Sequence, residues 1–125
     1  DDLQFYCNPG EISQIFTNLI VNSILHAYDD GESNGKISIK FEKRKKCLAI
    51  EYMDDGKGMK KEVIDRAFEP FFTTRKGSEG SGLGLNIISN IIKQKFGGTI
   101  ECESEYGNGT RFLINLPLSL ISIKE

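Results

Sequence analysis

Apolar residues recur along this chain with two different periods, and the period indicates which element each segment forms. Helical spacing, with apolar residues three and four positions apart, covers residues 9–28 and residues 83–96. A shorter stretch, KKEVIDRAF at residues 60–68, suits a short helix. The sequence therefore predicts three helices.

Capping and turn residues mark the ends of the two longer helices. The run Asn8-Pro9-Gly10-Glu11 is typical of a helix start, with the asparagine as N-cap, the proline at the first helical position and the glutamate placed for a capping box. Two consecutive glycines at 97–98 follow the second long helix and end it. The first helix is thus expected from about Pro9 to about Tyr28, and the other from about Leu83 to about Phe96.

Alternating apolar and polar residues mark the strands. KISIKFE and LAIEYMD, at residues 36–42 and 48–54, flank the basic run KRKK and predict neighbouring antiparallel strands. TIECES and TRFLINLP supply two more strands, and LQFYC near the N-terminus adds a fifth. For the tail LSLISIKE three outcomes stay open, namely pairing as an edge strand, packing on another domain, and no part in the fold. Because strand pairs are adjacent along the chain, the sequence predicts an α+β fold, a two-layer α/β sandwich with a mixed sheet of about five strands under three helices.

Composition describes one ordinary globular domain. The chain has 125 residues, of which 38% are hydrophobic and 27% charged, so residues 1–125 are expected to share a single core. No apolar run approaches the roughly 20 residues of a membrane span, and the N-terminal residues lack the pattern of a signal peptide, so a cytoplasmic location is expected. The net charge is −2, and KRKK suits a solvated turn, so no nucleic-acid partner is indicated. Three scattered cysteines suggest neither a disulfide framework nor a metal site: Cys7, Cys47 and Cys102.

Two asparagines lie on one face of the first helix. Asn18 and Asn22 are four residues apart, beside the apolar residues Ile15 and Leu19. Asparagine is a poor residue for a helix interior, so its presence twice needs a reason. Two interpretations stay open: the amides bond back to the helix, or they face a polar ligand.

The strand at 48–54 ends in an acidic, glycine-containing turn. Asp54-Asp55-Gly56-Lys57-Gly58 is compatible with a plain polar turn. Under the functional interpretation, Gly56 and Gly58 let a planar ligand approach the backbone, and the Asp54 carboxylate accepts a hydrogen from an exocyclic amino group. Such an acceptor favours adenine, which offers an amino donor, over guanine, which offers a carbonyl oxygen at the same place.

Glycines also crowd the stretch GSEGSGLGLNII, residues 77–88. Residues 69–82 show little periodicity and suit a long loop or lid, and long loops in compact domains tend to be functional. A mobile linker remains one interpretation. The other is a phosphate site, because backbone amides and the helix dipole at a helix start attract anions. Thr110 is the last residue of the turn segment 107–110. Two interpretations fit it: a plain strand residue after the turn, or a residue whose hydroxyl braces Asp54 or a bridging water.

Taken in order, these segments resemble the catalytic ATP-binding domain of sensor histidine kinases, in the superfamily that also holds the gyrase, Hsp90 and MutL ATPase domains and whose fold is called the Bergerat fold. The resemblance covers nearly the whole chain. Its motifs are NLIVNSILHA (18–27), DDGKGM (54–59), FEPFFTT (68–74), GSGLGLNI (80–87) and GNGTRFLINLP (107–117).

The resemblance implies ATP and Mg²⁺ as cofactors and gives roles to single residues. Asn22 matches the asparagine whose side-chain oxygen holds Mg²⁺, and Asn18 matches its upstream companion. Asp54 matches the adenine-binding aspartate. The remaining implied contacts to the nucleotide are Gly56 and Gly58 behind the base, Gly80, Gly82, Leu83, Gly84 and Leu85 at the phosphates, and Thr110 near the adenine.

Other positions match the family less completely. His26 falls where many relatives carry a tyrosine or histidine that contacts phosphate, although a packed or solvated side chain is equally compatible. Arg75 or Lys76 in the lid could reach the γ-phosphate, and a solvated charge in the loop is equally compatible. Asn18 replaces the glutamate that activates water in the hydrolases of the superfamily, so efficient ATP hydrolysis is not expected. Leu25 stands where many histidine kinases carry a lysine.

The implied activity is transfer of the γ-phosphate of ATP to a histidine on a separate dimerisation domain, followed by transfer to the receiver domain of a response regulator. The full-length protein would be a homodimer, whose anchoring at a membrane stays open, and the isolated domain a monomer that binds ATP with little turnover. Two alternatives stay open: a conformational ATPase of the same superfamily, and a non-catalytic module that binds nucleotide or a partner protein.

Overall fold

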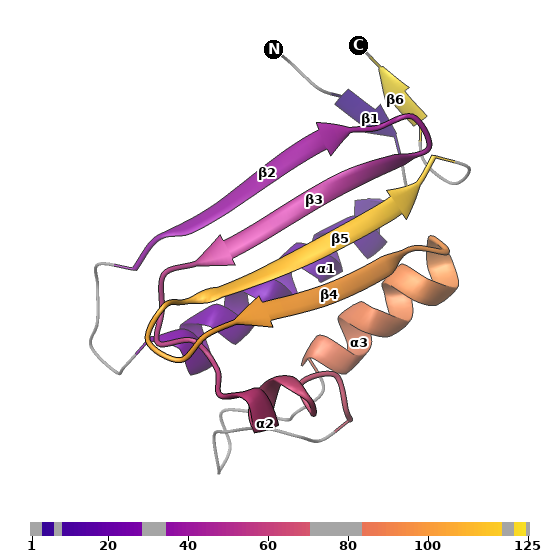
Figure 1. Ribbon diagram of the computed structural model, residues 1–125. Coiled ribbons are helices and arrows are strands. Elements are labelled where there is room, and N and C mark those ends of the chain that lie inside the picture. The colour runs from indigo at the N-terminus through magenta and orange to yellow at the C-terminus, as the bar shows by residue number, and fades with distance from the viewer. Residues whose placement is uncertain (1–3, 7–8, 29–34, 71–83, 119–121, 125) are drawn as a thin grey trace.

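A four-stranded antiparallel sheet with helices on one face forms the body of the protein (Figure 1). The computed structural model describes residues 4–6, 9–28, 35–70, 84–118 and 122–124. The strand order is β2-β3-β5-β4. The strands are β2 (Ile37–Lys43), β3 (Cys47–Asp54), β4 (Thr99–Ser104) and β5 (Thr110–Pro117).

Two long helical segments cover the sheet and confirm the helices predicted from apolar spacing. The first is α1 (Pro9–Asn22), which continues into the π-helical turn η1 (Ser23–Ala27). Asn22 keeps helical angles (φ −59°, ψ −42°), and Tyr28 ends the helix in an extended conformation (φ −121°). The predicted N-cap, Asn8, lies outside the described residues.

The second long helical segment and the short helix also form where the sequence predicted them. The long segment consists of α3 (Gly84–Asn90) and the π-helical turn η2 (Ile91–Lys95), and it packs beside α1. Gly97 follows with a φ of 66°, as expected of a glycine that ends a helix. The short helix predicted at residues 60–68 is a single turn, α2 (Lys61–Ile64). Among the described residues, no helix has the length and apolar character needed to cross a bilayer.

The sheet differs in two respects from the mixed sheet of five strands that the sequence suggested. Every strand pair in it is antiparallel. Short turns join the pairs β2–β3 and β4–β5, whereas β3 and β5 pair across the intervening helices and β4. The predicted N-terminal strand does form, as β1 (Gln4–Tyr6), but it pairs with β6 (Ser122–Lys124) in a separate two-stranded sheet. Residues 122–124 of the tail therefore supply an edge strand, one of the three outcomes left open for the tail.

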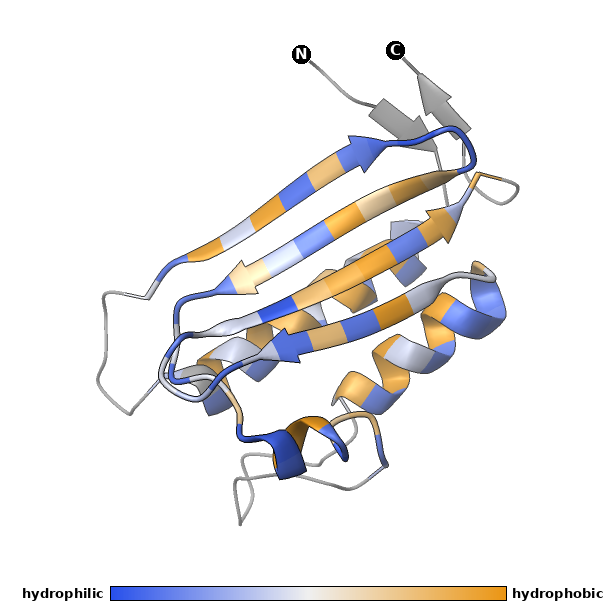
Figure 2. Cartoon of the chain, viewed as in Figure 1, coloured by the Kyte–Doolittle hydropathy of each residue, from blue (hydrophilic) through white to orange (hydrophobic). Residues whose placement is uncertain are grey.

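The core lies between the sheet and the two long helices, and alternation along the strands decides which residues enter it (Figure 2). In β3 and β5 every second residue is buried, and the buried residues face α1 and α3. The central residues of this layer are Ile15, Leu19, Leu48, Ile50, Tyr52, Ile88, Ile92, Phe112, Ile114 and Leu116. The same alternation carries two polar side chains to the end of the buried face, Asp54 on β3 and Thr110 on β5, which are register partners.

Candidate functional site

Asp54 ends β3 with its side chain on the helix-facing side of the sheet, only 7% exposed. Both carboxylate oxygens accept hydrogen bonds. The Ser23 hydroxyl donates to Oδ2 at 2.9 Å, and the Gly56 amide donates to Oδ1 at 3.1 Å. Because each carboxylate oxygen has two acceptor sites, the carboxylate can still accept a hydrogen from a ligand. The structure thus joins the end of α1 to the turn that the sequence marked as a binding segment.

Thr110 lies opposite Asp54 and is equally buried. Its hydroxyl contacts the Ser104 hydroxyl at 3.0 Å. Ser104 donates to the Gly109 carbonyl oxygen at 2.7 Å and accepts from the Met59 amide at 2.8 Å. Since the Ser104 proton is committed to a carbonyl, the Thr110 hydroxyl is the donor in the contact between them. Thr110 therefore has acceptor lone pairs left and no proton left to donate.

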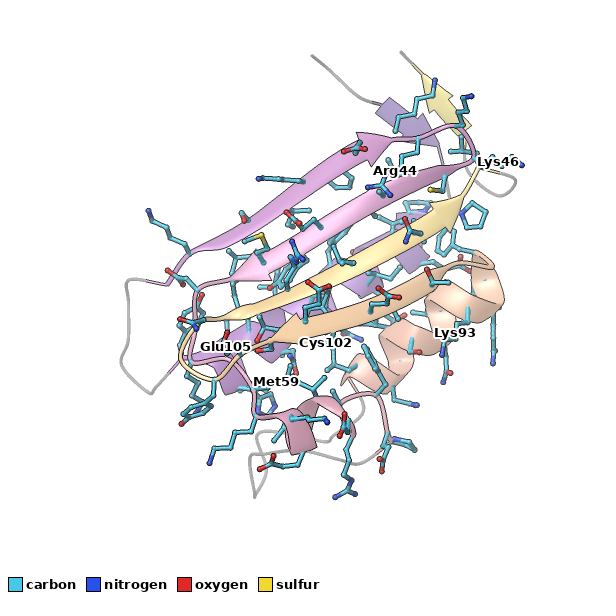
Figure 3. The ribbon with its side chains drawn as sticks, in the orientation of Figure 1. Arg44, Lys46, Met59, Lys93, Cys102 and Glu105 are labelled. Carbon is cyan, nitrogen blue, oxygen red and sulfur yellow. The ribbon has the colours of Figure 1, made fainter. Side chains whose placement is uncertain are left out.

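The glycines near Asp54 are required by close approach of two turns. Gly58 and Gly109 have φ values of 71° and 83°. A Cβ at Gly58 would overlap the Glu105 carbonyl oxygen, and one at Gly109 would overlap the Asp54 carbonyl oxygen. Figure 3 shows Met59 and Glu105 at the same end of the sheet. The structure thus gives Gly58 a packing role that is separate from the room for a planar ligand predicted from the sequence.

The neighbouring aspartate, Asp55, has a different and structural role. Its Oδ1 accepts from the Lys36 amide at 2.8 Å and from the Tyr28 hydroxyl at 2.7 Å. These bonds, the one from the Lys36 backbone first, lower the pKa of Asp55. Burial, together with the bond to Asp55, raises the pKa of Tyr28. This cluster fastens the start of β2 to the end of β3.

The residues predicted to face the phosphates are less buried. Asn18 and Asn22 on α1 are partly exposed, as is His26 in η1. Among the residues that the structure describes, neither asparagine side chain forms a hydrogen bond. The helix-bonding interpretation of the two amides is therefore not supported.

The glycine-rich segment is described only from the start of α3. Gly84 is the first residue of that helix, with open space where a Cβ would point, and Leu85 belongs to the core. The other predicted residues of this segment and of the lid lie outside the described residues, namely Arg75, Lys76, Gly80, Gly82 and Leu83. The described chain thus supplies α3 and its first amides, packed beside α1.

Several polar residues that hold the site together were missed by sequence reasoning. Ser23 follows Asn22 directly, and Tyr52 precedes Asp54 by two residues on the same face of β3. Ser104 is the register partner of Thr110. On α3, the Asn86 side chain donates to the Phe68 carbonyl oxygen at 3.2 Å. Only their positions in the sequence could have indicated them. One is a serine inside the helix that carries the two asparagines, and another lies two residues from a predicted site residue on the same strand.

No group of three or more His, Cys, Asp or Glu side chains that could hold a metal ion occurs within the described ranges. The basic turn after β2 lies at the opposite end of the sheet from Met59 and Glu105, as Arg44 and Lys46 show in Figure 3. The Arg44 amide closes this hairpin by donating to the Cys47 carbonyl oxygen at 2.9 Å, which confirms the predicted turn.

Known proteins resemble this chain over most of its length. Residues 7–120 match the family described as histidine kinase-, DNA gyrase B- and HSP90-like ATPases. Sensor histidine kinase ZraS of Escherichia coli (strain K12) is 33% identical over 117 residues, which cover 94% of this chain and 24% of that protein. Sporulation kinase E of Bacillus subtilis (strain 168) is 39% identical over 119 residues, covering 94% of this chain and 15% of that protein. The chain thus spans about a quarter or less of these relatives.

A solved structure shows the same fold. The catalytic domain of histidine kinase ThkA, in a nucleotide-free form, superposes with a TM-score of 0.73 at 32% identity, covering 89% of this chain and 69% of that one. The matches confirm the resemblance inferred from the motifs and the predicted fold class. The chain therefore belongs to the family of histidine kinase-, DNA gyrase B- and HSP90-like ATPases, in which it is similar to the catalytic domains of sensor histidine kinases.

Proposed function

We propose that this chain is the ATP-binding catalytic domain of a two-component sensor histidine kinase, which donates the γ-phosphate of Mg-ATP to a histidine on a separate dimerisation domain. The observation that carries the proposal is the buried Asp54 carboxylate, held by Ser23 and the Gly56 amide beside the acceptor oxygen of Thr110. A response regulator receiver domain is the expected later acceptor. Use of ATP implies a cytoplasmic location for this domain.

The base subsite follows from hydrogen-bond polarity. Asp54 offers carboxylate oxygens, and the Thr110 proton is directed at Ser104, so both side chains present acceptors. The amino group of adenine can donate to such a subsite. The carbonyl oxygen of guanine at the equivalent position would face these acceptors without a proton between them. We therefore assign Asp54, Thr110 and the turn containing Gly56 and Gly58 to adenine.

The phosphate subsite is assigned to the exposed side of α1 and the start of α3. The Asn22 amide oxygen is a hard ligand of the kind that Mg²⁺ prefers, and Mg²⁺ often takes only one or two protein ligands beside phosphates and water. The described residues fit a metal that arrives with the nucleotide. Mg²⁺, when bound, neutralises phosphate charge. The first amides of α3, at Gly84 and Leu85, would hold phosphate oxygens, with His26 and Arg75 as further contacts.

The chain's own residues would bind and orient ATP without completing a reaction. An asparagine amide is not a proton acceptor comparable to a carboxylate, so Asn18 would not activate water as a glutamate does. His26 belongs to the nucleotide-binding helix, so we assign the acceptor histidine to another domain. The isolated domain is therefore expected to bind ATP with little hydrolysis. Measurable hydrolysis that disappears in an Asn22→Ala variant would favour a conformational ATPase instead.

Calorimetric titration with ATP and with GTP, each with Mg²⁺, tests the base assignment. Asp54→Asn should weaken ATP binding by at least about 1.5 kcal/mol, the lower end for a hydrogen bond to a charged group. The matched control is Asp55→Asn, which alters the adjacent carboxylate that faces Lys36 and Tyr28, and it should keep the preference for ATP. If the chain is folded but does not bind ATP, the proposal is overturned, and a partner-binding module becomes the interpretation.

Phosphotransfer needs its own assay. The domain is mixed with a histidine-containing dimerisation domain and ATP labelled at the γ-phosphate, and label on the added histidine is the expected result. Tight ATP binding without label transfer to any such domain, its own parent's included, would favour the non-catalytic alternative.

A further inference from the structure

We infer that Ser23 is a positioning residue of the base subsite, whose hydroxyl holds the Asp54 carboxylate in the orientation that selects adenine. This inference rests on the proposed function. Neither the motifs in the sequence nor the resemblance assigned any role to Ser23.

Geometry ties Ser23 to Asp54 from one side. Ser23 is 1% exposed, and its hydroxyl donates to Asp54 Oδ2 at 2.9 Å. The Gly56 amide holds the other oxygen, Oδ1, at 3.1 Å. The two donors come from different elements, the helix and the turn after β3. Together they fix the rotation of the carboxylate plane, and with it the direction of the lone pairs that remain for a base.

Tyr52 restricts the Ser23 hydroxyl in turn. The Tyr52 side chain is fully buried, and its Oη lies 2.7 Å from Ser23 Oγ and 3.1 Å from the Leu19 carbonyl oxygen. A carboxylate only accepts, so the Ser23 proton points at Asp54. The single Tyr52 proton then lies between two acceptors, Ser23 Oγ and the Leu19 carbonyl oxygen. Rotation of Ser23 away from Asp54 would leave a buried carboxylate oxygen without this donor, which is costly.

The position of Ser23 also relates the two halves of the proposed site. Asn22, the proposed Mg²⁺ ligand, precedes it on the same helix. The bond from Ser23 therefore sets the base-binding carboxylate at a fixed place relative to the metal-binding amide. With an apolar side chain at position 23, only packing would set the distance between the Asp54 carboxylate and the Asn22 amide.

Two variants of matched shape separate a positioning role from simple packing. Ser23→Thr and Ser23→Val add nearly the same bulk to a buried site, and only Thr keeps the hydroxyl. Calorimetry with Mg-ATP and with Mg-GTP is the measurement, after circular dichroism has shown that both variants fold. We expect Ser23→Thr to keep the wild-type ratio of ATP to GTP affinity within about twofold, and Ser23→Val to lower that ratio about tenfold, as for loss of a hydrogen bond to a charged group.

A double-mutant cycle provides the second measurement, which does not depend on added bulk. Ser23→Ala should weaken ATP binding about tenfold in the wild-type background and less than twofold in the Asp54→Asn background, because the serine acts through the carboxylate. Equal ATP-to-GTP ratios in the Thr and Val variants, or an undiminished effect of Ser23→Ala beside Asp54→Asn, would overturn the inference while ATP binding itself stands. Failure of the wild-type chain to bind ATP would instead overturn the proposed function.

Discussion

The base side and the phosphate side of the proposed site differ in how far the chain itself satisfies their polar groups. On the base side, Asp54 and Thr110 are buried, and each is bonded to a serine hydroxyl. On the phosphate side, Asn18 and Asn22 are partly exposed, and their amides form no hydrogen bond with the part of the chain that the structure describes. Under the proposed function, base recognition would be built into the fold, whereas the phosphate side would be completed by its ligand.

The largest effect is expected where the base side is packed most tightly. Gly109→Ala should lower the free energy of unfolding by more than about 3 kcal/mol, because it adds overlap with the Asp54 carbonyl oxygen to the strain of a positive φ. Gly107 also has a positive φ but open space around a Cβ, so Gly107→Ala should cost only about 1–2 kcal/mol. Urea denaturation of both variants checks this. Equal losses would show that the contact between the two turns contributes nothing.

Ser104→Ala should have the next largest effect on stability, a loss of about 1–3 kcal/mol, since it removes the partner of the Met59 amide. It also frees the Thr110 proton, so the ratio of ATP to GTP affinity should fall a few-fold. The control is Ser38→Ala on β2, at an exposed position, where less than about 0.5 kcal/mol is expected. An unchanged nucleotide preference in a destabilised Ser104→Ala protein would contradict the assigned direction of the Thr110 hydroxyl.

Asn22→Ala tests the phosphate side. In the presence of Mg²⁺ the variant should bind ATP about tenfold more weakly than the wild type, or about 1.4 kcal/mol. When the metal is chelated, the two proteins should bind ATP with nearly the same affinity. Stability should change by less than about 0.5 kcal/mol, because the Asn22 side chain forms no hydrogen bond among the described residues. The preference for ATP over GTP should persist. A changed preference would mean that the two sides do not act separately.

The smallest effect expected concerns pH and the Asp55 cluster. The folded pKa of Asp55 is lowered, so its bonds contribute stability above the unfolded pKa of about 3.9, and this contribution is lost as pH falls through the folded value. Thermal unfolding between pH 5 and the acid limit should therefore show a shallower pH dependence in Asp55→Asn than in the wild type. If stability depends on pH equally steeply in both proteins, Asp55 does not contribute to the loss of stability in acid.

Parts of this arrangement were predictable from the sequence because they depend on local pattern. Asp54 ends an alternating strand before glycines, and helical spacing gave both long helices. The partners of the site residues were not predictable, because they depend on register and helix rotation. Ser104 reaches Thr110 only because β4 and β5 pair in the observed register.

The same limit explains the other differences. Ser23 reaches Asp54 only because α1 continues through η1 over the end of β3. The fifth strand predicted for the main sheet pairs instead with the tail, a choice between partners that the three-residue β1 does not encode by itself. The sequence predicted a functional role for Gly58, but its close approach to the Glu105 carbonyl oxygen could be seen only in the folded structure.

The β1–β6 ribbon has a mechanical consequence. Gln4 pairs with Lys124 and Tyr6 with Ser122, so segments joined to the two ends of the described chain start side by side, about 5 Å apart (Figure 1). Tension between such segments loads the ribbon from its open end and breaks its hydrogen bonds one after another, as a zipper opens. Such tension would reach α1 and β5, the elements next to β1 and β6 along the chain, only after the ribbon had separated. Under such tension the ribbon would therefore separate before any strain reached the strand that carries Asp54.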